Sequence, residues 1–172
     1  PNLTYVQAAE NLLDLLLSRL NMTPNSILLD VGCGMGAQDI YIVNKINPKK
    51  IDAIDATKVH IDISKKRQEK NNIPQEKLEF RHATALSVPF PDNHFSHILS
   101  IEAPEHFDTR EKFFYEAYRV LNSGGVIAMS DYTINRNPET VLEKVTARIV
   151  AWLWQVPKEN LYNNSEYEKK ME

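Results

Sequence analysis

Three alternating glycines, Gly32, Gly34 and Gly36, follow the apolar run 27–31 and give this chain its clearest chemical signal. Such a run is typical of a buried parallel strand, and the apolar residues after Gly36 recur at helical spacing. Glycine tolerates the backbone angles of a tight strand-to-helix turn and lets main-chain amides approach a ligand closely. The sequence therefore predicts a strand, a glycine loop and a helix N-terminus, which is a site suited to a nucleotide or a nucleoside.

Two aspartates accompany the glycine loop. Asp55 ends the next predicted strand, where a carboxylate can accept hydrogen bonds from both hydroxyls of a ribose. Its alternative role is to cap the following helix, for which Thr57 is also a candidate cap. Asp30 lies within the buried strand itself, where an unpaired carboxylate is costly. We expect Asp30 either to fix the loop or to attract a cationic ligand.

The spacing Gly32-x-Gly34-x-x-Ala37 also fits a dinucleotide-binding fingerprint, so an NAD(P)-binding oxidoreductase is the first alternative. Asp30 disfavours it, because a carboxylate is a poor neighbour for a doubly anionic pyrophosphate. A ligand with a positive centre and no phosphate suits the site better. Cys33 fits the loop as a small side chain, since no histidine or lysine adjoins it in sequence that would favour a nucleophile.

Candidates for handling the substrate follow the predicted strands 95–101 and 126–129, because open α/β sheets bind ligands at the carboxyl ends of their strands. His106 has the chemistry of a general base near neutral pH, and its alternative is a surface residue at a helix start. Glu102 and Asp131 are further catalytic candidates, and each also suits a strand end as an ordinary polar residue. The other histidines show no spacing typical of a metal site, so no metal is expected.

Strands and helices alternate along the chain, and this rhythm predicts the framework that positions these residues. We expect a doubly wound α/β fold with an open, mostly parallel, Rossmann-like sheet and right-handed crossovers. Between the third and fourth strands, two prolines two residues apart indicate a turn over 88–93. The predicted strands are 27–31, 51–55, 78–80, 95–101 and 126–129, and the principal predicted helices are 4–20, 37–46, 57–72, 108–123 and 138–156.

Capping signals predict where several helices begin and end. Asp108 with Glu111 predicts a capping box, and Gly124 predicts the C-cap of the same helix. Ser165 with Glu168 predicts another capping box close to the end of the chain. No strand pattern follows it. We therefore expect the closing C-terminal strands of a doubly wound sheet to be missing, from a truncated or partly unobserved chain.

The helix predicted over 138–156 follows the fifth strand and is expected to lie over the carboxyl ends of the strands as a cap on the substrate. Trp152 and Trp154 are part of this helix. They either line a pocket, where aromatic faces favour cationic or flat apolar acceptors, or they belong to the core.

The composition predicts a single domain over 1–172, with a net charge of −3 and no basic block. This balance excludes a nucleic-acid phosphate as the main partner. The longest near-apolar run, 12–17, is too short to span a bilayer and contains Asp14. The chain opens without a signal-peptide pattern and has one cysteine, so we expect a cytoplasmic protein. Nothing in the sequence indicates a homo-oligomer, and nothing excludes one.

Several segments together resemble the class I S-adenosylmethionine-dependent methyltransferases, in the right order over most of the chain. The segment 29–36 resembles their motif I, and Asp55 matches the acidic end of their second strand. Residues 86–95 resemble their segment LPFPD…FD, and residues 119–125 resemble the turn RVLKPGG before the fifth strand. Residues 100–107 are most similar to the branch that acts on small molecules such as quinones, sterols and glycine or sarcosine.

The resemblance implies S-adenosylmethionine as cofactor, with in-line methyl transfer to a small-molecule acceptor. Thr84 stands where relatives often carry an aspartate that contacts adenine, and Ser96 replaces the usual aspartate after Phe95. An inactive, methyltransferase-like binding subunit is therefore a second alternative. The residues that the resemblance places at the cofactor are Asp30, Gly32, Cys33, Gly34, Gly36, Asp55, Ala56, Thr84, Ala85 and Ile101.

Overall fold

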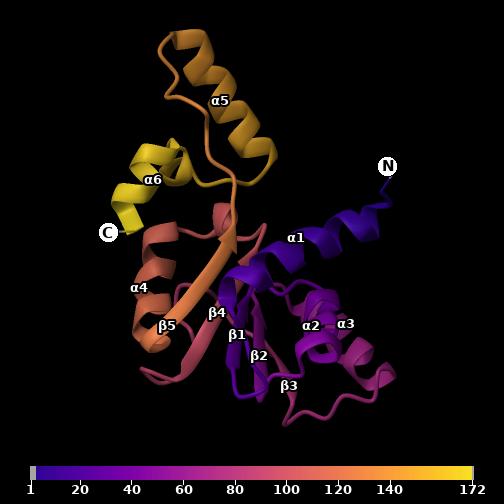
Figure 1. Cartoon of the computed structure of the whole chain (residues 1–172). Helices are drawn as coiled ribbons and strands as arrows, with labels where there is room; N and C mark the ends of the chain where they lie inside the picture. Colours follow the sequence, from indigo (N-terminus) through magenta and orange to yellow (C-terminus); the bar gives the residue numbers. More distant parts are fainter. Residues whose placement is uncertain (1–2, 172) are drawn as a thin grey trace.

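A five-stranded sheet, in which every described strand pairing is parallel, forms the centre of the computed structural model, which describes residues 3–171 (Figure 1). The chain runs outward from β1 to β3, and then returns to the other side of β1 to form β4 and β5. The predicted doubly wound fold is thus confirmed, and the ends of β1 and β4 flank the point where the strand order reverses, which is where such sheets bind ligands. The strands are β1 (Ile27–Val31), β2 (Lys50–Asp55), β3 (Leu78–His82), β4 (Phe95–Ile101) and β5 (Leu121–Ser130), in the spatial order β3-β2-β1-β4-β5.

The helices cover both faces of this sheet, which explains why its central strands are apolar throughout. Alternate residues of β1 feed two separate cores: Leu28 packs with residues of α1, α2 and α3, whereas Leu29 packs with residues of α4. Both side chains are completely buried. The helices are α1 (Tyr5–Leu20), α2 (Ala37–Ile46), α3 (Lys58–Lys70), α4 (Arg110–Val120), α5 (Val141–Leu153) and α6 (Asn164–Met171), and none has the length and apolar character of a membrane span.

The predicted boundaries of α4 were wrong at both ends. The helix begins at Arg110 with Thr109 as its N-cap and without a side-chain capping bond, so Asp108 and Glu111 form no capping box. It ends at Val120, and β5 begins with the next residue. Because Leu121 already pairs with Phe95 of β4, the chain enters the sheet before it reaches Gly124, which therefore is not a helix C-cap.

The starts of the two C-terminal helices differ from the expected ones. Helix α5 begins at Val141 instead of Pro138, because Thr140 caps it reciprocally with Glu143. At α6, the Asn163 side chain accepts a hydrogen bond from the Glu166 amide at 3.1 Å, so the predicted box from Ser165 to Glu168 was wrong. Thr140 and Asn163 therefore supply the capping acceptors of these two helices.

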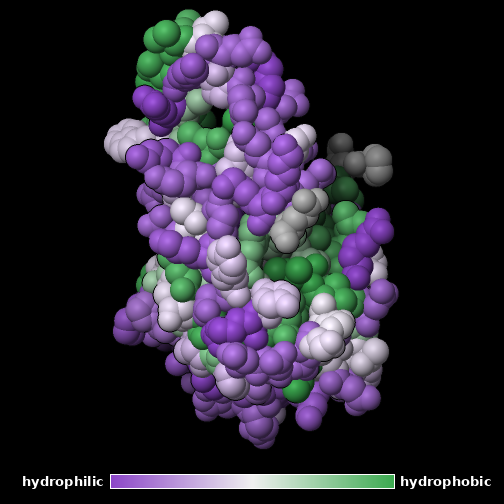
Figure 2. Space-filling view, turned by 90° about the vertical axis from the view of Figure 1, so that its left-hand side faces the viewer, coloured by the Kyte–Doolittle hydropathy of each residue, from purple (hydrophilic) through white to green (hydrophobic). Residues whose placement is uncertain are grey.

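Helix α5 extends beyond the carboxyl ends of the strands instead of packing into the core (Figure 1). Its buried side chain is Ala151, whereas Trp152 and Trp154 are 77% and 64% exposed. The core alternative for these tryptophans was therefore wrong. Figure 2 shows hydrophobic side chains at the surface of this protruding part of the molecule.

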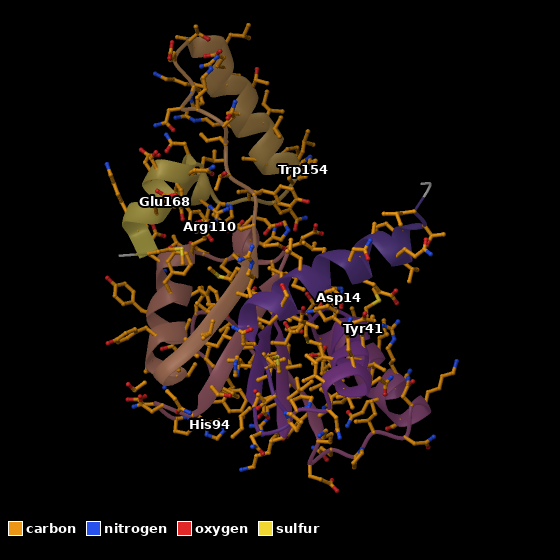
Figure 3. All side chains as sticks on the ribbon, in the orientation of Figure 1. Asp14, Tyr41, His94, Arg110, Trp154 and Glu168 are labelled. Carbon is orange, nitrogen blue, oxygen red and sulfur yellow. The ribbon has the colours of Figure 1, made fainter. Side chains whose placement is uncertain are left out.

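A buried arginine anchors the base of this protruding part. The Arg110 guanidinium is fully buried; its Nε and Nη2 donate to the two Asp131 carboxylate oxygens at 2.6 and 2.8 Å, and its Nη1 donates to the Asn160 carbonyl oxygen. Tyr167 donates a further hydrogen bond to Asp131 at 2.8 Å, and the Tyr162 ring lies 5.0 Å from the guanidinium carbon. The start of α4, the end of β5 and the C-terminal segment are thereby joined (Figure 3). Asp131, a predicted catalytic residue, is therefore held in a buried ion pair.

Candidate functional site

The glycine loop is fixed to the end of β2 by its own amides. The amides of Gly32 and Cys33 donate to the Ile54 carbonyl oxygen at 2.8 and 3.1 Å, and the Gly34 amide donates to Asp55 Oδ2 at 2.9 Å. A Cβ atom on Gly32 would lie 2.4 Å from the Cβ atom of Ala103, so the loop passes the end of β4 too closely for any side chain. A Cβ atom on Gly34 would meet no atom within 4 Å. The loop therefore presents open backbone at that residue.

Asp55 organises the end of β2. Its Oδ1 accepts a hydrogen bond from the Thr57 amide at 2.8 Å and lies 3.2 Å from His60 Nδ1. Asp55 thus closes a turn just before α3, whereas Thr57 is the N-cap and its side chain makes no capping bond, contrary to expectation. These two contacts occupy Oδ1, whereas Oδ2 accepts only from the Gly34 amide and keeps a lone pair for a hydroxyl donor. His60 was missed because it was considered only as a possible metal ligand. Its place in the first turn of α3, just after Asp55, was the available signal.

A cleft of about 240 Å³ opens at the carboxyl ends of β1, β2 and β3, and we call it the first cleft. It brings together the predicted residues Gly32, Asp55, Ala56, Thr84, Ala85 and His106. Phe107 and Asp108 complete its wall and were missed, because they follow the helical turn Pro104–His106 in a segment without periodic signal. The lining residues include two carboxylates and no lysine or arginine, which suits a nucleoside better than a diphosphate.

A larger cleft of about 570 Å³, the second cleft, lies between α1, α2 and the end of β4. Ile101 and Glu102 line this second cleft and not the first one, so the structure separates them from Thr84 and Ala85. Gln38, in the first turn of α2, also lines it. The predicted site is therefore two neighbouring clefts on either side of the glycine loop.

Two buried carboxyl groups lie beneath the glycine loop. Asp30, at the end of β1, accepts a hydrogen bond from Gln38 Nε2, and Asp39 lies in the first turn of α2; both side chains are completely buried. Asp30 Oδ1 and both oxygens of Asp39 have no hydrogen-bond partner among the described residues. Burial raises the pKa of Asp30 to about 6, and burial together with Asp30 raises the pKa of Asp39 well above its usual range. Asp39 was missed because an aspartate in a first helical turn is ordinarily explained by the helix dipole.

Replacing Asp39 with asparagine should make the stability less sensitive to pH. The folded state holds the Asp39 proton more tightly than the unfolded state, whose ordinary carboxyl pKa is about 4. The stability that this proton contributes is therefore complete below about pH 4 and is lost as the pH rises through the folded-state pKa. We expect the free energy of unfolding of Asp39→Asn, relative to the wild type, to increase by about 1–2 kcal/mol between pH 5 and pH 8. Urea unfolding at both pH values measures this.

The exposed Glu76 provides the control, because Glu76→Gln should leave the pH dependence of stability as in the wild type. An Asp39→Asn variant that differs from the wild type by the same amount at both pH values would contradict the buried-carboxyl interpretation.

The remaining predicted residues take simpler places. Burial raises the pKa of the Cys33 thiol, which keeps it protonated and unreactive. Ser96 Oγ accepts from the Ile27 amide at 2.9 Å and donates to the Ile27 carbonyl oxygen at 3.1 Å, so the residue in place of the usual aspartate joins β4 to β1. Within residues 3–171, no three histidine, cysteine or acidic side chains gather as metal ligands would.

His106 and Glu102 lie at the mouths of the two clefts. His106 lines the first cleft, is half-exposed, and has Nδ1 3.4 Å from the Gln155 carbonyl oxygen. Glu102 has a left-handed backbone with φ of +48°, and its amide donates to the carbonyl and hydroxyl oxygens of Ser130. Both side chains can therefore reach a ligand that spans the ends of β1 and β4.

A parallel sheet with a glycine loop at its reversal point and a carboxylate at the end of β2 defines the class of nucleoside-binding α/β domains. Within this class, the chain belongs to the family described as methyltransferase domain, whose model matches residues 29–129. The predicted resemblance is thus confirmed, and the oxidoreductase alternative is set aside.

Among its curated relatives, erythromycin 3''-O-methyltransferase from Saccharopolyspora erythraea is 34% identical over 73% of this chain and 40% of that protein. Ajmaline N-methyltransferase from Rauvolfia serpentina is 29% identical over 73% of this chain and 46% of that protein. The chain thus spans less than half the length of these relatives.

Two solved structures show the same fold at low identity. The [4+2]-cyclase SpnF superposes with a TM-score of 0.82 at 20% identity, covering 99% of this chain and 57% of that one. Geranyl diphosphate C-methyltransferase from Streptomyces coelicolor A3(2), solved with S-adenosyl-L-homocysteine, gives a TM-score of 0.78 at 17% identity, covering 95% and 59%.

Proposed function

We propose that this domain binds S-adenosylmethionine and catalyses transfer of its methyl group to a small-molecule acceptor. The observation that carries the proposal is the open Gly34 backbone held against Asp55 above a buried, incompletely partnered Asp30. Relatives named as methyltransferases of erythromycin and ajmaline support a small-molecule acceptor. The single cysteine is free and buried, as suits a reducing compartment, and we propose the cytoplasm as the location.

The residues present fit the cofactor in charge and shape. In the proposal, Asp55 binds the ribose hydroxyls, and Thr84 and Ala85 lie beside the adenine in the first cleft. The Thr84 hydroxyl oxygen already accepts from the Leu86 amide at 3.2 Å and has a second lone pair for the adenine amino group. Asp30, whose Oδ1 lacks a partner, supplies negative charge near the amino-acid part, which carries an ammonium. When bound, the cofactor supplies an electrophilic methyl group on a sulfonium.

The chain's own residues align the acceptor and manage its proton, because in-line displacement depends mainly on orientation. For a hydroxyl acceptor, His106 would hold the proton that the acceptor oxygen loses. Glu102 orients the acceptor from the second cleft. Incubating the protein with methyl-labelled S-adenosylmethionine and a cell extract, followed by identification of the labelled product, tests this function. Binding of the cofactor without transfer to any metabolite would favour the inactive binding subunit instead.

Replacing Asp55 with alanine should weaken binding of S-adenosylhomocysteine by about 1–3 kcal/mol, which is roughly a 5- to 150-fold rise in Kd. The variant loses the ribose acceptor and also the bond that fixes the Gly34 amide. Calorimetric titration measures the effect. Asp55→Asn keeps one acceptor oxygen and should fall between alanine and the wild type, whereas unchanged affinity in Asp55→Ala would refute the ribose contact.

A further inference from the structure

The second cleft has apolar walls and a negatively charged rim. Residues 5–13 of α1 and Ile101 supply most of the apolar surface, and the charged lining residues are Glu10 and Glu102. Within the described part of the chain, no lysine, arginine or histidine lines this cleft. A volume of about 570 Å³ is in the range of sites that hold small molecules. The cleft therefore suits an apolar body, and its charges oppose an anion.

Lys45 of α2 does not offset the Glu10 and Glu102 carboxylates. Tyr41 lines the cleft, but its hydroxyl donates to Asp14 Oδ1 at 3.0 Å, and Lys45 Nζ lies 2.6 Å from Asp14 Oδ2 (Figure 3). The charge of Lys45 is thus paired with an acidic residue of α1, and Glu10 and Glu102 have no described salt-bridge partner.

Two aromatic side chains extend the rim at Glu102. Tyr132 donates a hydrogen bond to Glu102 Oε1 at 3.3 Å, and its ring meets the Trp154 ring edge to face with centroids 6.3 Å apart. Both rings are more than half exposed, so their free surfaces are available to a ligand. Tyr5, which lines the cleft from α1, is 88% exposed. Aromatic faces beside carboxylates are the surroundings that bind organic ammonium groups.

A third carboxyl group, whose pKa burial raises, lies near this rim. Glu105 is almost completely buried, and its Oε2 has no hydrogen-bond partner among the described residues. Its effect reaches the rim, because the Glu102 and Glu105 carboxylates both raise the pKa of the Tyr132 hydroxyl, Glu102 more strongly. Glu105 Oε1 lies 3.9 Å from His106 Nε2, so the negative charge of the rim rests mainly on Glu10 and Glu102.

We propose that the methyl acceptor carries a protonated amine on an apolar body, and that the second cleft binds this amine between Glu102 and the rings of Tyr132 and Trp154. This inference rests on the proposed methyl transfer and names the chemical class of its acceptor. Acceptors bearing a carboxylate or phosphate at the same position are rejected by charge.

Three probes of one shape and different charge test the proposal: 1-aminoadamantane, 1-adamantanol and adamantane-1-carboxylate. Because the chain has two tryptophans, Trp152→Phe leaves Trp154 as the sole fluorescent reporter, and calorimetry provides a second readout. In the presence of saturating S-adenosylhomocysteine, we expect the amine to bind at least tenfold more tightly than the carboxylate, with the alcohol between them. Equal affinities, or no response to the amine in either readout, would overturn the proposal.

The variant Glu102→Gln separates the amine site from the cofactor site. It should weaken binding of the amine about three- to tenfold and change binding of the alcohol less than twofold, while Glu76→Gln, on an exposed turn, changes neither. An unchanged amine preference would overturn the proposal, as would a larger effect on S-adenosylhomocysteine than on the amine, because the carboxylate would then belong to the cofactor site. Failure of the wild type to bind S-adenosylhomocysteine, measured first, would count against the proposed function itself.

Discussion

Replacing Arg110 with methionine should lower the free energy of unfolding by about 3–5 kcal/mol, because it leaves the Asp131 carboxylate buried without its cation. The substitution also removes the donors to the Asn160 and Tyr132 carbonyl oxygens, which hold the C-terminal segment against α4 and the end of β5. Urea unfolding followed by circular dichroism measures the loss.

Two comparisons show whether the buried ion pair is the cause. The double variant Arg110→Met, Asp131→Leu removes both charges and should be more stable than Arg110→Met alone. Arg136→Met breaks an ion pair with Glu143 that is largely exposed, and should cost much less than Arg110→Met. An Arg110→Met variant that loses no more than the Arg136 variant would contradict the structural role given to this cluster.

Replacing His106 with alanine should lower the rate of methyl transfer to a hydroxyl acceptor by about 10²- to 10⁴-fold, because a general base contributes a factor of this size. His106 lies on the wall of the first cleft and is half-exposed, and its ring makes only long contacts, to Gln155 and to Glu105, so its loss should leave the fold intact. Initial rates of label transfer to the acceptor identified from the cell extract measure the effect.

His94 is the matched control, since its ring stacks on Phe90 and lies at the opposite end of β4 from the clefts (Figure 3). His94→Ala should transfer methyl groups at close to the wild-type rate. Equal rates in His106→Ala and the wild type would show that His106 is a surface residue at a helix start, which is the alternative that its sequence position left open.

The strands and the glycine loop could be predicted because their signals are local. Short runs rich in apolar residues identify β1 and β4 without reference to the rest of the chain, and alternating glycines identify the turn that follows β1. The ends of α4 could not be predicted in this way. Pairing of Leu121 with Phe95 ends that helix early, and such pairing between strands depends on the assembled sheet.

The site was predictable on its nucleoside side and less so on its acceptor side. Asp55 ends β2, and Thr84 follows β3. These two strands are direct neighbours in the sheet, so their carboxyl ends lie side by side. Asp131 also follows a strand, but a buried arginine from α4 takes up its carboxylate, and no sequence spacing reveals such a partner. His60 and Asp39 each occupy a first helical turn, and their proximity to Asp55 and Asp30 is evident only in the folded chain.

Calorimetric titration of this chain with S-adenosylhomocysteine, beside a parallel titration with ADP, tests the central claim most directly. A glycine loop backed by Asp30 and Asp55, in a cleft without lysine or arginine, should bind S-adenosylhomocysteine at one site per chain and give no measurable binding of ADP. Saturable binding of ADP together with no response to S-adenosylhomocysteine would contradict the account.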